Sequence, residues 1–255
     1  MSFNNRVGVI CAVFALIAIS FFYMFSSAAL LIWPTRLHME KNEKSVAIWI
    51  ENQGNEEQML QARAFLWTQK EGKDQLTPQT TVMVSPPMAK VAPGAKQLFR
   101  VVNKIPAPQG TLQTYRIIVD EIPKKSTPKP LDFDTDVQQG VKFQFRYSIP
   151  LFIYGQGLQE KARLALSNEA ILENLSWKIR EESGTRWLEI SNKGAYYLHL
   201  TDISFDQPAK STGSGELSGY ILPKSTVKWP LPQKIVIGDR LHAILNGKDA
   251  IVLSK

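Results

Sequence analysis

Short apolar runs that end at turn residues recur along the chain after residue 30, and this pattern constrains the fold most. Residues 45–51 are rich in β-branched and aromatic side chains and stop at a turn cluster, 52–55. Further runs of this kind occupy residues 62–67, 97–102, 115–119, 163–166, 176–180, 187–191, 196–203, 226–229, 241–245 and 250–253. No segment after residue 30 keeps an apolar period of 3.6 residues for three helical turns. The pattern therefore predicts an all-β protein built as a sandwich.

The first 29 residues have the organisation of a secretory signal peptide. Residues 7–25 form an uncharged apolar run, with Arg6 before it and small residues after it. Ser27 and Ala29 suit the small-residue positions of a cleavage site, so we expect cleavage after Ala29 and export of the remainder. An uncleaved membrane anchor is the alternative, because the run is nearly long enough to span a bilayer.

Length and composition suit a globular protein of two modest domains. The chain has 255 residues, of which 44% are hydrophobic and 21% charged. Immunoglobulin-like sandwiches have about 100 residues each, so two of them fit after residue 29. Residues 123–140 have turn composition and are expected to form a long mobile loop. We therefore predict two immunoglobulin-like sandwiches, over residues 30–150 and 151–255.

Charge and reactive residues argue against several classes of function. Lys and Arg number 30 against 23 Asp and Glu, but no single basic run indicates nucleic acid as a partner. Cys11 is the only cysteine and the three histidines are far apart in sequence, so neither a disulfide nor a metal site is expected. Ser225 and Lys228 match the Ser-x-x-Lys pattern of penicillin-binding enzymes without the partner motifs that this chemistry requires. We expect neither enzyme activity nor a cofactor.

Residues 141–149 show the clearest alternation in the chain. Val141, Phe143, Phe145 and Tyr147 alternate with polar side chains. One interpretation is a strand that buries this apolar face in its own sandwich. The other is an edge strand that pairs with another protein, whose groove receives the alternate side chains. An apolar edge without a partner promotes aggregation, so self-association of the free protein is a further expectation.

Four arginines of the first predicted sandwich are candidates for holding a carboxylate. Arg36 follows Trp33 and Pro34 in the first predicted strand, and the others lie on later strands: Arg100, Arg116 and Arg146. A guanidinium group can bind a carboxylate through two parallel hydrogen bonds. Taken singly, each arginine fits an ordinary surface charge better than a binding site.

Several motifs in combination resemble the periplasmic pilus chaperones of the PapD family. They comprise Asn52 after the strand 45–51, the Ser-Pro-Pro turn and Pro-Gly within 85–94, the strand 97–100, the run 115–123, the alternating strand with its end at 149–152, and the segment 192–201. The runs 31–34 and 115–123 resemble the archaic branch of chaperone–usher systems. The resemblance extends over nearly all of the chain after residue 29.

This resemblance implies a boomerang-shaped periplasmic chaperone whose partners are pilin subunits and an outer-membrane usher. The strand 141–149 would fill the groove that a pilin has in place of its last strand. Val141, Phe143, Phe145 and Tyr147 would then be the side chains inserted into that groove. An exported structural or adhesive protein of a surface fibre is the alternative for the same chain.

One position departs from the family pattern. Better-known members hold the terminal carboxylate of the subunit with two basic residues in the cleft between the domains. The first of these matches Arg36, whereas the second falls on Pro150. The resemblance therefore leaves the second group open among Arg100, Arg116, Arg146 and backbone groups.

Overall fold

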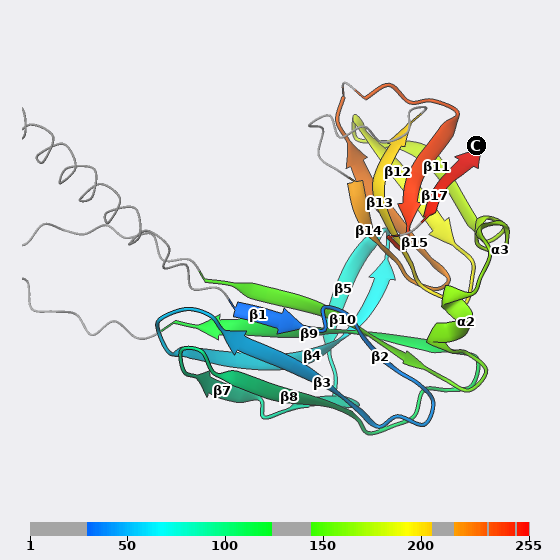
Figure 1. The fold of residues 1–255 in the computed structure, drawn as a ribbon. Helices are drawn as coiled ribbons and strands as arrows, with labels where there is room; N and C mark the ends of the chain where they lie inside the picture. Colours follow the sequence, from blue (N-terminus) through cyan, green and yellow to red (C-terminus); the bar gives the residue numbers. More distant parts are fainter. Residues whose placement is uncertain (1–29, 124–143, 206–216, 234, 248, 255) are drawn as a thin grey trace, which may run out of the picture.

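The computed structural model describes residues 30–123, 144–205, 217–233, 235–247 and 249–254. The expected signal peptide, nearly all of the expected loop, Val141 and Phe143 lie outside the described residues. The described residues form two β-sandwiches that meet at an angle, so the molecule has the shape of a boomerang (Figure 1). The predicted all-β architecture of two sandwiches is confirmed.

The first sandwich packs a four-stranded sheet against a larger sheet. The four-stranded sheet has the order β1 (Leu30–Trp33), β3 (Ser45–Asn52), β8 (Lys96–Asn103) and β6 (Val82–Ser85). The larger sheet has the order β2 (Leu37–Met39), β10 (Arg146–Tyr154), β9 (Leu112–Ile122), β4 (Gln58–Lys70) and β5 (Lys73–Pro78), and β7 (Met88–Val91) also pairs with β4. β2 runs parallel to β10, whereas β9 is antiparallel to it.

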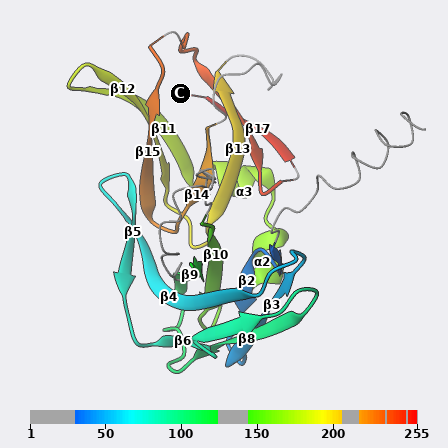
Figure 2. The same cartoon turned by 90° about the vertical axis from the view of Figure 1, so that its left-hand side faces the viewer.

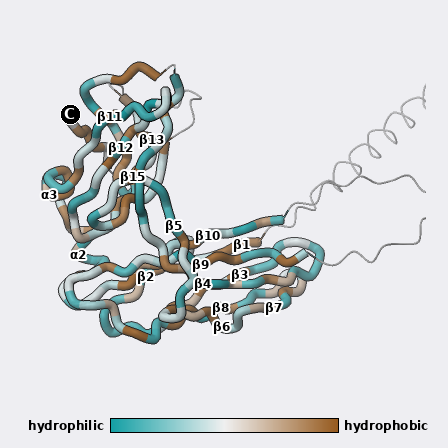
Figure 3. Tube along the Cα trace, turned by 180° about the vertical axis from the view of Figure 1, so that it is seen from behind, coloured by the Kyte–Doolittle hydropathy of each residue, from teal (hydrophilic) through white to brown (hydrophobic). Residues whose placement is uncertain are grey.

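The core of the first sandwich follows from the alternation of side chains along its strands. The inward residues of β3 and β8 are fully buried: Ile48, Ile50, Phe99 and Val101. They pack against inward residues of the larger sheet, among them Leu60, Ile117, Val119 and Leu151. Figure 3 shows hydrophobic stretches that alternate with polar ones along the strands of this sandwich. Each such side chain contributes about 1.5–3 kcal/mol of burial free energy, so packing alone can stabilise the domain.

The second sandwich packs a three-stranded sheet against a four-stranded one. The first has the order β11 (Leu175–Glu182), β12 (Thr185–Asn192) and β15 (Ser225–Leu231), and the second β14 (Leu217–Ile221), β13 (Leu198–Phe205), β16 (Arg240–Leu245) and β17 (Asp249–Ser254). Trp177 of β11 is buried between the sheets, and its Nε1 donates to the carbonyl oxygen of Leu253 at 3.1 Å. This bond ties the two layers together.

Residues 163–166, predicted as a strand, belong instead to a short helical connection between the sandwiches. It contains α2 (Glu160–Leu164) and α3 (Asn168–Leu172). Helices of this length show no helical period in the sequence, which explains the wrong prediction. Arg163 and Glu160 form an ion pair of 2.6 Å at a spacing of three residues, which brings the two side chains together on a helix.

β10 continues the first sandwich past residue 150, where the domain boundary was predicted. Leu151 and Ile153 are buried in the first core, whereas Phe152 and Tyr154 pack against the second sandwich. Because side chains alternate along a strand, β10 contributes both to the core and to the domain interface.

Candidate functional site

A compact aromatic cluster joins the two sandwiches. Trp67, Phe152 and Tyr154 come from the first sandwich, and Tyr197 and Leu222 from the second, and all five are buried. The rings of Phe152 and Tyr197 stack nearly parallel, with their centroids 3.5 Å apart. Aromatic burial of this kind holds the two domains against each other.

Arg116 of β9 lies over this cluster. Its guanidinium carbon is 3.7 Å from the ring centroid of Trp67 and 5.3 Å from that of Tyr220. Burial lowers the pKa of Arg116, and the charges of Asp74 and Tyr220 act in the opposite direction. An arginine remains cationic at neutral pH even so, and the rings hold its plane in one orientation.

Arg36, Pro150 and Arg116 form a row across the larger sheet. Pro150 is directly opposite Arg116 in the pairing of β9 and β10. Leu37 of β2 is opposite Leu151, which places Arg36, one residue earlier, beside Pro150. Arg36 itself lies in the bend between β1 and β2, not within a strand as predicted. The position at which the family pattern has a basic residue therefore has an arginine on each side.

His199 of β13 approaches the two arginines from the second sandwich. Its ring is 4.3 Å from that of Tyr220, measured between centroids. Burial lowers the pKa of His199, and the positive charges of Arg36 and Arg116 lower it further. His199, Tyr220 and Trp67 were missed in the sequence, because their proximity to the arginines depends on how the domains meet.

The other two candidate arginines lie elsewhere. Arg100 is exposed on β8, in the sheet on the far side of the first sandwich from the second (Figure 1). Arg146 donates from Nε to Asp120 Oδ1 at 2.5 Å, and Arg63 binds the other carboxylate oxygen at 2.6 Å. Burial would raise the pKa of Asp120, but hydrogen bonds and charges from Arg146 and Arg63 hold it below its ordinary value. Arg146 thus fixes the beginning of β10 to β9.

The edge of β10 before residue 150 is the second feature of the site. β9 pairs with the whole of β10 on one side, whereas β2 covers only Leu151–Ile153 on the other. No strand in the described part of the chain pairs with residues 146–150 on that second side. Tyr147 packs partly against its own core, but Phe145 is 43% exposed. From residue 147 onward, the strand therefore buries its apolar side chains in its own sandwich. Phe145 remains exposed to solvent.

A buried ion pair between Glu160 and Arg163 lies where the linker meets the interface between the two sandwiches. Glu160 accepts hydrogen bonds from Arg163 Nη2 at 2.6 Å and from the hydroxyl of Tyr154. The guanidinium carbon of Arg163 is 4.4 Å from the ring centroid of Tyr197. Burial would raise the pKa of Glu160, but hydrogen bonds from Arg163 and Tyr154, with the charges of Arg163 and Arg36, hold it below its ordinary value. The pair thereby connects α2 to both sandwiches.

Replacing Glu160 by glutamine is expected to destabilise the protein by on the order of 2 kcal/mol at neutral pH, because Arg163 loses its buried counter-ion. The folded-state pKa of Glu160 lies below its unfolded value. Its contribution to stability is therefore present above the unfolded pKa and is lost as the pH falls through the folded one. The melting temperature of the wild type should thus fall more steeply than that of Glu160→Gln below pH 4.5, the ordinary pKa of the group.

Glu57→Gln is the matched control for this pH series. Glu57 is half-exposed and its ion pair with Lys90 is long, at 3.9 Å. This variant should follow the wild-type curve. Parallel curves for Glu160→Gln and the wild type would show that the buried pair does not contribute in this way.

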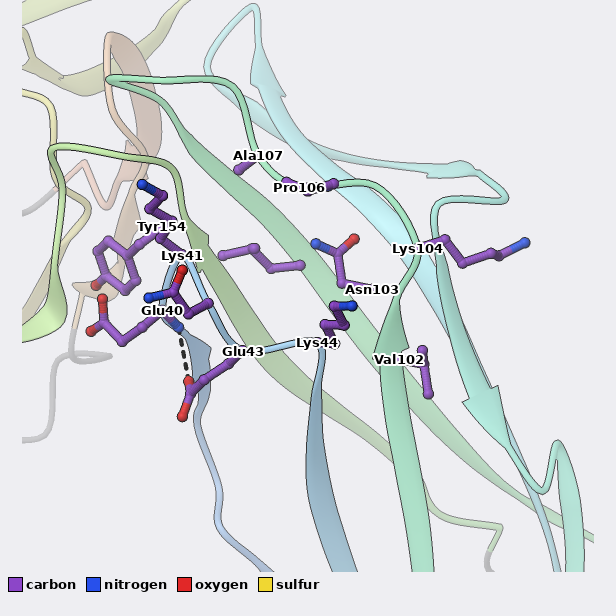
Figure 4. A pocket seen from close by; sticks show the side chains of 12 residues that line it. Glu40, Lys41, Glu43, Lys44, Val102, Asn103, Lys104, Pro106, Ala107 and Tyr154 are labelled. Carbon is purple, nitrogen blue, oxygen red and sulfur yellow. Dashed lines mark hydrogen bonds between the residues drawn. The ribbon is translucent and has the colours of Figure 1, made fainter.

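A pocket of about 460 Å³ lies at the end of the first sandwich beside the linker (Figure 4). Glu43 Oε2 accepts from the backbone N–H of Glu40 at 2.8 Å, and Glu40 Oε1 accepts from that of Glu160 at 2.9 Å. Both carboxylates therefore fix the backbone of the turn and the linker. Lys104 points away from Glu40 and Tyr154.

The Ser-x-x-Lys motif is not assembled as a catalytic pair. Ser225 and Lys228 are three residues apart on β15 and so point to opposite faces of the sheet. Lys228 Nζ pairs with Glu182 at 2.8 Å and with Glu189 at 3.1 Å. Among the described residues, no group of three or more His, Cys, Asp or Glu could hold a metal ion. The helices described there include none long and apolar enough to cross a membrane.

Two family models match the chain, one for each sandwich. Residues 29–159 match the N-terminal domain of the pili and flagellar-assembly chaperone PapD. Residues 170–245 match the C-terminal domain of the pili assembly chaperone PapD. No curated protein sequence matches the chain.

Solved structures share the two-domain arrangement. A chain in the CsuC–CsuE pre-assembly complex of chaperone and tip adhesion subunit, from the archaic chaperone–usher Csu pili of Acinetobacter baumannii, is 32% identical, with a TM-score of 0.69 over 89% of this chain and 98% of that one. A chain in the SafA pilin–SafB chaperone complex of Salmonella enterica is 14% identical, with a TM-score of 0.61 over 90% and 97%. The E. coli chaperone DraB is 16% identical, with a TM-score of 0.55 over 89% and 98%. The last two similarities concern the fold alone.

Proposed function

This chain belongs to the PapD family of pilus-assembly chaperones, which are periplasmic, and we propose that it captures pilin subunits along the open edge of β10. It holds each subunit until an outer-membrane usher receives it. The Csu structure named above is a complex of a chaperone with a tip adhesion subunit, which supports a pilus subunit as the partner here.

The observation that carries this proposal is the uncovered edge of β10 between residues 146 and 150. Backbone groups at such an edge can hydrogen-bond an incoming strand, and alternate side chains then fill the groove of the partner. Phe145 is already exposed, so it can enter that groove without leaving the chaperone core. We propose that Val141 and Phe143 continue this row and that Tyr147 lies at its inner end.

We propose Arg36 and Arg116 as the pair that binds the terminal carboxylate of the pilin. They flank Pro150, so Arg116 supplies from the neighbouring strand the charge that the family places at position 150. Charge-assisted bonds from two guanidinium groups are strong, and the aromatic rings beside Arg116 reduce competition by water. A carboxylate fixed here would set the register of the pilin strand along β10.

We also propose that residues 1–29 are removed during export. The uncharged apolar run 7–25 and the small residues Ser27 and Ala29 after it support cleavage after Ala29.

Purification of a tagged chain from the periplasm of its native host tests the proposal. Intact mass spectrometry is expected to show one small partner in equimolar amount and a chaperone that lacks residues 1–29. The chaperone alone, or a self-oligomer, from cells shown to be producing fibres would contradict the proposed function.

A further inference from the structure

The β4–β5 hairpin reaches out of the first sandwich and docks on the second. Figures 1 and 2 both show it rising from the larger sheet to the end of β15. At its tip, Gly72 forms a β-bridge with Val227, and the backbone N–H of Lys228 donates to Gly72 O at 2.9 Å. Backbone pairing therefore crosses from one domain to the other at this turn.

Gln69, three residues before the tip, adds two bonds to the second sandwich. Its side-chain Nε2 donates to the carbonyl oxygen of Tyr220 at 2.7 Å, and the backbone N–H of Leu222 donates to its Oε1 at 2.8 Å. One amide thus satisfies a donor and an acceptor of the chain at the end of β14. This geometry fixes the position of Tyr220 relative to β4.

The tip fits against β15 so closely that only glycine suits it. A Cβ atom built on Gly72 would lie 2.2 Å from Cγ and 2.8 Å from Cβ of Lys228. Lys228 cannot easily move aside, because its Nζ is held by Glu182 and Glu189. Close approach, and not the turn alone, therefore requires glycine here.

The hairpin bears directly on the arginine site. Trp67 lies two residues before Gln69 on β4, and Tyr220 is the residue whose carbonyl Gln69 binds. These are the two aromatic rings that contact the Arg116 guanidinium. The same hairpin therefore sets the positions of both rings, one from each domain.

We propose that the tip of the β4–β5 hairpin, through Gln69 and Gly72, is a brace that fixes the angle between the domains and so positions Arg116 for the pilin carboxylate. Gln69 and Gly72 are positioning residues and do not touch the pilin. The role of the brace in pilin binding rests on the proposed function, but its effect on the angle between the domains can be measured without a pilin.

Gly72→Ala tests the brace, and Gly184→Ala is its matched control. Gly72 and Gly184 are each the second residue of a hairpin turn, with φ values of +78° and +75°, and each follows a residue of positive φ. An alanine is strained similarly in both turns, but a Cβ on Gly184 would meet nothing within 4 Å. The difference between the variants thus isolates the contact between the domains.

Gln69→Ala is paired with Gln79→Ala in the same way. Gln79 also binds backbone groups with its amide, but all of them belong to the first sandwich: Ala64 O, Val82 O and Val82 N. Gln69→Ala removes two hydrogen bonds between the domains and should make the angle between them more variable. Gln79→Ala removes hydrogen bonds within the first sandwich and should leave that angle unchanged.

The first readout is the distance between two spin labels on the free chaperone, measured by pulsed electron paramagnetic resonance. Residues 30–255 contain no cysteine, so Met83→Cys on β6 and Val252→Cys on β17, both exposed, give one label per domain. We expect Gly72→Ala and Gln69→Ala to broaden or shift the distance distribution. Distributions that match those of Gly184→Ala and Gln79→Ala would overturn the brace.

The second readout is affinity for the pilin that co-purifies with the wild-type chain. The brace variants are expected to bind about tenfold more weakly, because fewer molecules hold the binding-competent angle. Combining Gln69→Ala with Arg116→Ala should add little to the loss from Arg116→Ala alone, since both act at one site. Unchanged pilin affinity in Gly72→Ala and Gln69→Ala would overturn the link to Arg116. So would a double variant whose loss of affinity equals the sum of the losses from Gln69→Ala and Arg116→Ala. A failure of the proposed function is distinguishable, because wild-type chaperone would then bind no pilin.

Discussion

Phe145→Asp is expected to reduce the amount of pilin recovered with the chaperone by about a hundredfold or more. An aspartate in place of Phe145 would bring an unpaired charge into an apolar groove of the pilin, at a cost above about 2.7 kcal/mol. The chaperone itself should fold normally, because the Phe145 side chain is 43% exposed before any partner binds. Co-purification from the periplasm and circular dichroism of the free variant measure the two effects.

Two variants control this experiment. Phe145→Leu keeps an apolar side chain and should retain most of the pilin. Val252→Asp places the same charge at a similarly exposed apolar position of the second sandwich, where Val252 is 44% exposed, and should leave capture unchanged. Normal pilin recovery with Phe145→Asp would contradict the insertion of this side chain.

Arg36→Ala and Arg116→Ala are each expected to weaken pilin binding by roughly 30-fold to 5000-fold. Truncation of one partner in a buried, hydrogen-bonded charge pair costs about 2–5 kcal/mol, much of it from the unpaired carboxylate. Arg116→Lys should restore little, because an ammonium group lacks the planar fork that lies over Trp67. Arg100→Ala is the control, since Arg100 is an exposed arginine of the opposite sheet.

A pilin with an amidated C-terminus separates this role from a general effect of charge. The amidated pilin should bind the wild-type chaperone as weakly as the unmodified pilin binds Arg116→Ala. Amidation of the pilin combined with Arg116→Ala should weaken binding little more than either change alone. An equal loss with Arg100→Ala, or full binding by Arg116→Ala, would contradict the assignment of the anchor.

The two sandwiches could be predicted from the sequence because their strands carry local signals. Residues 45–51 are rich in β-branched and aromatic side chains and stop at a turn cluster, and β3 occupies Ser45–Asn52. The helix α2 could not be predicted, because what holds it is the burial of Arg163 and Glu160 against Tyr154 and Tyr197 of the folded interface. A pattern that is read along the chain does not contain that contact.

The arginine site shows the same limit. Spacing along one strand exposes the departure at Pro150 but says nothing of its neighbours on adjacent strands. Arg116 is 34 positions away in sequence and reaches this row only through the register of β9 against β10. His199 and Tyr220 require, in addition, the angle between the domains.

Hydrogen exchange on the purified chaperone–pilin complex tests strand addition along β10 most directly. Backbone N–H groups of residues 146–149 that face the uncovered edge exchange with solvent in the free chaperone and should become protected once a pilin strand pairs there. Protection is expected to centre on these residues and to leave the far sheet around Arg100 unchanged. A complex in which the backbone N–H groups of residues 146–149 exchange as fast as in the free chaperone would contradict the capture of pilin by strand addition.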